Sequence, residues 1–141
     1  MIEQLNNIEA GDLLEKGKFG HLACVLENGE PYLVPINYLY FEGAIYVHTL
    51  PGKKLEAMRL NGKVCLQVEK IKDDYRWQSV IVFGEFQELQ ETEEKIKILQ
   101  AFCQRFEHLT PVEAMNEENW SISGIVIFRI NIKKITGITE R

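Results

Sequence analysis

Two adjacent lysines stand where a predicted helix begins, in the stretch YVHTLPGKKLEAM. A strand pattern that contains His48 and Thr49 runs into a Pro-Gly turn, and Lys53 and Lys54 then open a helix that we expect to end near Leu60. The first N–H groups of a helix lack partners and form the positive end of its dipole. A cation at this position therefore costs about 0.3–1 kcal/mol unless another group compensates it.

A bound phosphate would compensate both lysines. The N–H groups of the helix would face the phosphate, and Lys53, Lys54 and either His48 or Thr49 could donate hydrogen bonds to it. In the alternative interpretation both lysines are solvated and loosely paired with Glu56. The local pattern alone favours neither, and a single histidine in a strand is more often structural than catalytic.

A proline interrupts the strand pattern YLVPINYLY. Proline in a sheet is confined to edges, bulges and bends, because it has no N–H to donate. Pro35 therefore indicates that backbone groups between Val34 and Asn37 are unpaired and available to a planar heterocycle. An ordinary edge strand explains the proline equally well.

One serine lies on an otherwise apolar strand face in RWQSVIVFG. Side chains two residues apart share a face, so Ser79 lies beside Trp77 and Ile81. Its hydroxyl could donate to or accept from a ligand. The alternative is a serine that the strand merely tolerates.

Familiar catalytic and metal-binding motifs are absent from the sequence. His21, His48 and His108 are far apart, and neither HExxH nor a zinc-type Cys/His spacing occurs. Dinucleotide-binding GxGxxG, P-loop and GxSxG motifs are also missing. Difficult chemistry on this chain would therefore need a bound organic cofactor.

Length and charge bound the remaining possibilities. With 141 residues and a net charge of −5, the chain fits one domain, residues 1–141, and is not built to coat nucleic acid or an anionic membrane. No apolar run reaches the roughly 18 residues of a membrane span. The polar start does not resemble a signal peptide, so we expect a cytoplasmic protein without nucleic-acid or membrane partners. Three scattered cysteines are predicted to be core residues: Cys24, Cys65 and Cys103.

Strand patterns dominate the chain after a first predicted helix at Asn7–Lys16. Six strand segments follow: HLACVL, PYLVPINYLYF, AIYVHT, VCLQVE, about Arg76 to Leu89, and Gly124 to Ile135. A second long helix begins near Thr92, its expected N-cap. The last strand alternates with one core-facing side. The pattern predicts a mainly β, α+β fold, a six-stranded antiparallel barrel with flanking helices.

Together these stretches resemble the flavin-binding split-barrel superfamily of pyridoxamine 5′-phosphate oxidases, and within it the nitroimidazole-resistance proteins. The resemblance covers about Gly20 to Leu99 and is carried by the order and spacing of PYLVPINYLY, YVHTLPGKKLEAMR, VCLQVE, WQSVIVFGEFQEL and TEEKIKIL. It implies a split barrel that forms a homodimer and holds FMN, with FAD as the alternative, in clefts at the dimer interface. An apolar sheet around Val80, Val82 and Phe83 fits a dimer contact.

The resemblance also implies roles for nine residues. The backbone of residues 34–37 would line the isoalloxazine edge, a group of four would surround the phosphate, and a serine would lie near the polar side of the ring. In chain order they are Val34, Pro35, Ile36, Asn37, His48, Thr49, Lys53, Lys54 and Ser79. His48 matches a histidine that is linked to activity in the nitroimidazole-resistance branch. Ile138 stands where the family's last strand commonly has a lysine after Thr-Gly.

These expectations lead to three functional hypotheses. The first is a flavin-dependent reductase of small electron-poor compounds, including nitroaromatics, with His48 as proton donor because an ordinary imidazole titrates near neutrality. The second is a flavin carrier or sensor without turnover. The third is a barrel domain that binds a protein partner and no flavin. A second phosphate-binding cluster is missing, so pyridoxamine-phosphate oxidation is not expected.

Overall fold

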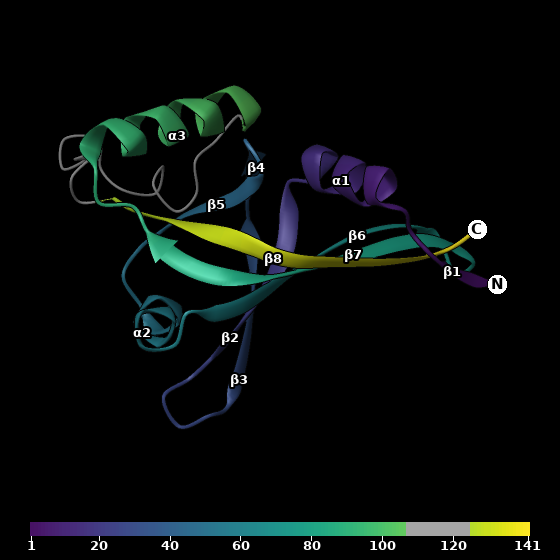
Figure 1. Cartoon of the computed structure of the whole chain (residues 1–141), viewed down its shortest axis with the longest axis horizontal. Coiled ribbons are helices and arrows are strands. Elements are labelled where there is room, and N and C mark those ends of the chain that lie inside the picture. The colour runs from purple at the N-terminus through teal and green to yellow at the C-terminus, as the bar shows by residue number, and fades with distance from the viewer. Residues whose placement is uncertain (107–124) are drawn as a thin grey trace.

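The computed structural model describes residues 1–106 and 125–141; His108 lies outside this part. Its strands are β1 (Ile2–Gln4), β2 (Phe19–Val25), β3 (Pro31–Asn37), β4 (Leu39–Phe41), β5 (Ala44–Thr49), β6 (Lys63–Asp73), β7 (Arg76–Glu88) and β8 (Val126–Glu140). Its helices are α1 (Asn7–Lys16), α2 (Lys53–Leu60) and α3 (Thr92–Arg105). The strands form one antiparallel sheet in the order β3-β2-β6-β7-β8-β5-β4, with β1 beside β8 (Figure 1). The predicted α+β, mainly β class is confirmed.

The sheet has eight strands rather than the six that the pattern predicted. β1 is a short terminal addition, and the single strand expected from PYLVPINYLYF is divided at Tyr38 into β3 and β4. The Tyr38 side chain is fully buried, and its hydroxyl donates a hydrogen bond to the carbonyl oxygen of Leu14 at 2.8 Å. This long-range contact holds the break between the two strands.

The division at Tyr38 brings the two ends of the sheet together. β3 and β4 are opposite ends of the strand order but neighbours in the chain, so the sheet curls until its edges meet there. β4 pairs with β5 only from Ala44 to Tyr46, so the last part of β5 pairs with β8 alone. The sheet is consequently split between β3 and the end of β5.

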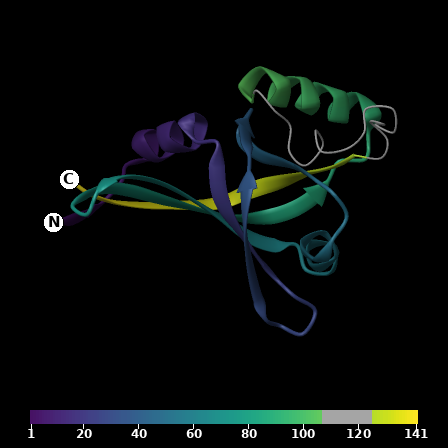
Figure 2. The same cartoon turned by 180° about the vertical axis from the view of Figure 1, so that it is seen from behind.

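Two apolar clusters lie on opposite faces of β8. Phe128 and Ile130 belong to the main core, which α1 and α2 also contact, whereas Ile127 packs in a second cluster with Phe102 of α3. β8 is therefore buried on both faces at Ile127 and Phe128. From Phe128 onward the predicted alternation holds, because Phe128 and Ile130 are buried whereas Arg129 and Asn131 are half-buried. In the view of Figure 2, α1 and α3 lie above the long strands β7 and β8, and α2 lies below them.

Two smaller predictions are corrected on α3. The helix is capped by Glu91 rather than Thr92, which is its first residue. Cys103 is exposed because the buried stripe of the helix consists of Ile98, Leu99 and Phe102. Of the three cysteines only Cys24 is a core residue, and Cys65 is half-buried. In the described part of the chain no helix is both long enough and apolar enough to span a membrane.

Candidate functional site

A pocket of about 240 Å³ opens where the sheet is split, between β3, the end of β5 and the start of α2. We call it the split pocket. Its described lining consists of Phe19, Pro35, Ile36, Asn37, Val47, His48, Thr49 and Lys54. Six of these were predicted from the sequence, all except Phe19 and Val47. None of the eight is acidic, so Lys54 makes the lining positive.

His48 is, with Thr49, one of the two buried polar residues that line the split pocket. It is 5% exposed, and its ring lies edge-on to Phe102 with the centroids 4.8 Å apart. Its Nδ1 has no hydrogen-bond partner in the described part of the chain. Burial lowers the pKa of His48 to about 4, and the positive charge of Lys54 adds to this shift. The imidazole is therefore neutral at pH 7. The proton-donor hypothesis assumed instead an ordinary imidazole, whose pKa lies near neutrality.

Lys54 brings a half-buried ammonium to the same pocket. Its Nζ donates a hydrogen bond to Oγ1 of Thr49 at 2.6 Å, and Thr49 in turn donates to the carbonyl oxygen of Leu50 at 3.0 Å. Burial lowers the pKa of Lys54, and the nearby Cys24 partly opposes this shift. Lys54 forms no ion pair with Glu56 or any other described carboxylate. An anion in the pocket would supply the missing counter-charge.

The start of α2 adds backbone donors. Gly52 is its N-cap, and no side chain caps the helix. The first N–H groups of a helix have no partner within the helix, so they favour a negative group at that end of the helix.

β3 contributes an edge strand. Within the described sheet it pairs with β2 and ends the strand order, and its residues Pro35, Ile36 and Asn37 line the split pocket. The side-chain amide of Asn37 donates to the carbonyl oxygen of Lys18 at 3.1 Å. Val34 does not line the split pocket; its side chain packs against the main core.

Lys53 and Ser79 lie outside the split pocket. Lys53 is exposed and its Nζ lies 5.4 Å from the centre of the Tyr32 ring. Ser79 accepts a hydrogen bond from Nε2 of Gln67 at 3.0 Å, and Oε1 of Gln67 lies 3.1 Å from Nδ1 of His21. The predicted phosphate group of four is thus divided, and Ser79 belongs to a cross-strand polar network.

Two lining residues were missed by the sequence reasoning. Val47 directly precedes His48 in β5, so the prediction of His48 as a site residue already placed Val47 near the site. Phe19 begins β2 and is 57% exposed. No sequence motif marks it.

Comparison with known proteins gives a consistent picture. The family model described as pyridoxamine 5′-phosphate oxidase matches residues 7–139. An uncharacterized protein of Rhizobium meliloti (strain 1021) is 34% identical over 92 residues, which cover 65% of this chain and 60% of that protein. The match therefore spans less than two thirds of that relative.

Solved structures share the fold over nearly the whole chain. An FAD-binding protein from Mesorhizobium loti is 29% identical, with a TM-score of 0.77, over 100% of this chain and 99% of that one. A protein from Bacteroides thetaiotaomicron with the provisional name 5-nitroimidazole antibiotic resistance protein has a TM-score of 0.78 over 99% and 89% of the two chains. Its identity of 17% establishes likeness of fold alone.

Proposed function

The chain belongs to the pyridoxamine 5′-phosphate oxidase family, and we propose that it is a flavin-dependent oxidoreductase. Its substrates would be small electron-poor compounds, including nitroaromatics such as nitroimidazoles. Family membership and the likeness to a flavin-binding protein support the flavin. The substrate class rests on the sequence resemblance to nitroimidazole-resistance proteins. The bound group would be FMN, or FAD through its flavin mononucleotide half.

One observation carries the proposal: among the described residues, the split pocket holds a buried histidine nitrogen without a hydrogen-bond partner beside a half-buried ammonium without a carboxylate. A buried polar atom without a hydrogen bond costs about 1–3 kcal/mol. The unpaired nitrogen lies in the split pocket, whose described lining contains no acidic side chain. A phosphorylated ligand offers acceptors for both His48 and Lys54, so the residues present fit the flavin phosphate.

Each group of the pocket would have a distinct role toward the cofactor. Lys54, Thr49 and the first N–H groups of α2 would hold the phosphate, and the lining residues of β3 would face the ring. A bound flavin supplies hydride transfer. His48 would hold a proton on one ring nitrogen, and a nearby anion would raise its pKa because opposite charge favours the imidazolium.

A lysine substitution tests the cofactor site. Lys54→Ala should weaken FMN binding by about 10- to 100-fold, since a charge-assisted hydrogen bond contributes about 1.5–3 kcal/mol. Fluorescence titration of the apoprotein measures this, and Lys63→Ala, at an exposed lysine of β6, is the matched control. Wild type should prefer FMN to riboflavin, and Lys54→Ala should lose that preference. Equal FMN affinity in wild type and Lys54→Ala would contradict the phosphate site.

A carrier or sensor without turnover is the second candidate. It is favoured by the burial of His48, which lowers its pKa to about 4 in the protein without flavin and so disfavours the imidazolium that would donate a proton. Reduction of the flavin-loaded protein by NADH or NADPH, followed by addition of a nitroimidazole, separates the two. Reoxidation that depends on the nitro compound supports the reductase, and its absence supports the carrier. His48→Ala should then reduce turnover more than flavin content.

A homodimer forms part of the proposal. The outer face of the sheet exposes Phe19, Leu33, Phe83 and Ile138, an apolar set typical of a contact surface. Val80 and Val82, expected on this face, are instead fully buried within one chain. A stable homodimer interface buries about 2,000 Å² or more in total. Light scattering that finds a flavin-loaded monomer at micromolar concentration would refute it.

A further inference from the structure

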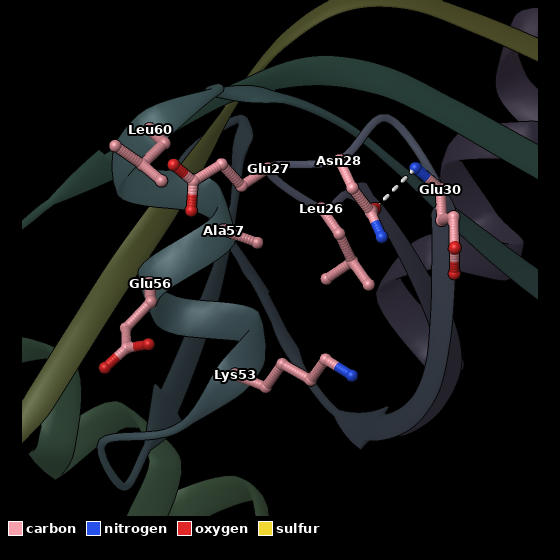
Figure 3. Close-up of a pocket in the computed structure, with 8 residues that line it drawn as sticks. All are labelled: Leu26, Glu27, Asn28, Glu30, Lys53, Glu56, Ala57 and Leu60. Atoms are coloured by element: carbon pink, nitrogen blue, oxygen red, sulfur yellow. Dashed lines mark hydrogen bonds between the residues drawn. The ribbon is translucent and has the colours of Figure 1, made fainter.

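We propose, on the basis of the proposed flavin site, that the cofactor is the dinucleotide FAD, and that its adenosine end occupies a second pocket beside Lys53. This pocket of about 460 Å³ lies between the β2–β3 hairpin and α2, and we call it the hairpin pocket (Figure 3). Its described lining consists of Leu26, Glu27, Asn28, Glu30, Lys53, Glu56, Ala57 and Leu60. Its volume falls within the range of about 300–1,000 Å³ that is usual for ligand sites.

The two pockets lie on either side of the start of α2. Lys53 and Lys54 are consecutive, but Lys54 lines the split pocket and Lys53 lines the hairpin pocket. Figure 3 shows Lys53 extending from the first turn of α2 toward the hairpin. A phosphate at the helix start therefore has the flavin pocket on one side and the hairpin pocket on the other.

β3 connects the same two places. Ile36 lines the split pocket, and Tyr32, which lies under the Lys53 ammonium, is four residues earlier on the strand. At about 3.3 Å per residue these positions are roughly 13 Å apart. FMN ends at its phosphate, whereas the second phosphate and adenosine of FAD continue beyond it. FMN would fill the split pocket alone, whereas the dinucleotide would extend from the split pocket into the hairpin pocket.

The lining chemistry matches a nucleoside. Leu26, Ala57 and Leu60 supply an apolar surface for a base (Figure 3). Glu27 and Glu30 supply carboxylate oxygens, the acceptors that ribose hydroxyls require. The side-chain oxygen of Asn28 accepts from the backbone N–H of Glu30 at 3.0 Å, so its amide hydrogens remain for a ligand.

The hairpin fixes these groups in place. The backbone N–H of Leu26 donates to the carbonyl oxygen of Glu30 at 2.9 Å, and that of Gly29 donates to Leu26 at 2.8 Å. Gly29 has a φ of 87°, which favours glycine in this tight turn. The acceptors are thus presented on a closed turn rather than on an open loop.

Charge limits which ligands fit the hairpin pocket. Among its described lining residues Lys53 carries the one positive charge, against Glu27, Glu30 and Glu56. Figure 3 shows the Glu56 carboxylate directed away from the pocket centre. The remaining carboxylates repel a free polyphosphate but accept a neutral adenosine that is attached through one phosphate beside Lys53. We therefore expect FAD to bind and ATP not to compete.

The first test compares two flavins. Apoprotein titrated with FAD and with FMN should bind FAD about tenfold more tightly, the contribution of one further charge-assisted hydrogen bond. Mass spectrometry of the flavin released from the purified protein should find FAD. FMN alone, or equal affinities for the two flavins, would overturn the inference and leave the flavin site intact.

The second test fills the hairpin pocket. Leu60 is 68% exposed at the end of α2, so Leu60→Trp should fold, occupy the pocket and abolish the preference for FAD while FMN affinity changes less than about twofold. Ile8→Trp, at an 83% exposed position on α1, is the control and should change neither affinity. An unchanged FAD preference in Leu60→Trp would overturn the inference. Failure of wild type to bind either flavin would instead overturn the flavin proposal and this inference with it.

Discussion

The starts of α1 and α2 obey opposite rules. At α1 the side-chain oxygen of Asn6 accepts a hydrogen bond from the backbone N–H of Glu9 at 2.8 Å, and Glu9 supplies a negative charge in the first turn. At α2 the cap is Gly52, no described side chain caps the helix, and Lys53 and Lys54 precede the acidic residue of the first turn, Glu56.

The difference shows that the start of α1 favours a stable helix, whereas the start of α2 does not. A side-chain cap contributes about 0.5–2 kcal/mol, and a cation in the first turn costs about 0.3–1 kcal/mol. α1 has the stabilising side-chain cap and no cation in its first turn, whereas α2 has two cations there and no described side-chain cap. The start of α2 is also where the split and hairpin pockets meet. Local rules that fail together beside a cavity are typical of a binding site.

The largest expected effect is a pH dependence of the free energy of unfolding, caused by the burial of His48 beside Lys54 of α2. An unfolded imidazole titrates near pH 6.5, whereas His48 in the fold titrates near 4. Between these values the unfolded state binds more protons, so the free energy of unfolding should fall by up to about 3 kcal/mol as the pH drops from 6.5 to 4. Above pH 6.5 this contribution is complete. Urea unfolding of the apoprotein at several pH values measures it.

Two variants isolate the contribution of His48. His48→Gln should flatten the pH dependence between 4 and 6.5, whatever its effect on stability at pH 7. His21→Gln, at the half-buried histidine of β2, should leave the dependence in place. Equal slopes for wild type and His48→Gln would mean that His48 is not the group responsible.

A capping substitution at α2 would break the comparison between the helix starts. Gly52 has extended backbone angles, and a Cβ there meets no atom within 4 Å, so other residues fit. Gly52→Asp should raise the free energy of unfolding of the apoprotein by about 0.5–1 kcal/mol, because it supplies a cap and a negative charge. It should also weaken FMN binding by about tenfold, since the carboxylate occupies the proposed phosphate position.

Controls separate the cap from the charge. Gly52→Asn adds a neutral cap and should weaken FMN binding less than Gly52→Asp. Asn6→Ala removes the cap of α1 and should cost about 1 kcal/mol of stability without changing FMN affinity. If Gly52→Asp binds FMN as tightly as wild type, no anion binds at the start of α2.

The smallest effect is expected at Lys53 in the apoprotein. Its unfavourable position at the helix dipole costs about 0.3–1 kcal/mol, and its contact with the Tyr32 ring returns about 0.5–1 kcal/mol. Lys53→Ala should therefore change the free energy of unfolding by less than about 0.5 kcal/mol, as measured by denaturant unfolding without flavin. A loss above about 1 kcal/mol would show that Lys53 has a structural role.

The sequence determined those features that depend on near neighbours in the chain. It predicted the bounds of α1 and α2 and the extent of β7 to within one residue, because apolar periodicity, glycines and a Pro-Gly turn act locally. It also identified most of the split pocket, since Pro35 and the conflict at Lys54 are visible as broken local rules.

Tertiary structure decided what contacts between distant residues control. The Tyr38 hydroxyl donates to the carbonyl oxygen of Leu14 where the strand breaks. This break adds one strand to the predicted six, β1 adds the other, and the break also forms the split at the pocket. The pKa of His48 depends on burial against Phe102 and on Lys54. Lys53 and Lys54 are equivalent in the sequence, but successive helix residues project in different directions, and only the packing of α2 between two pockets gives them different surroundings.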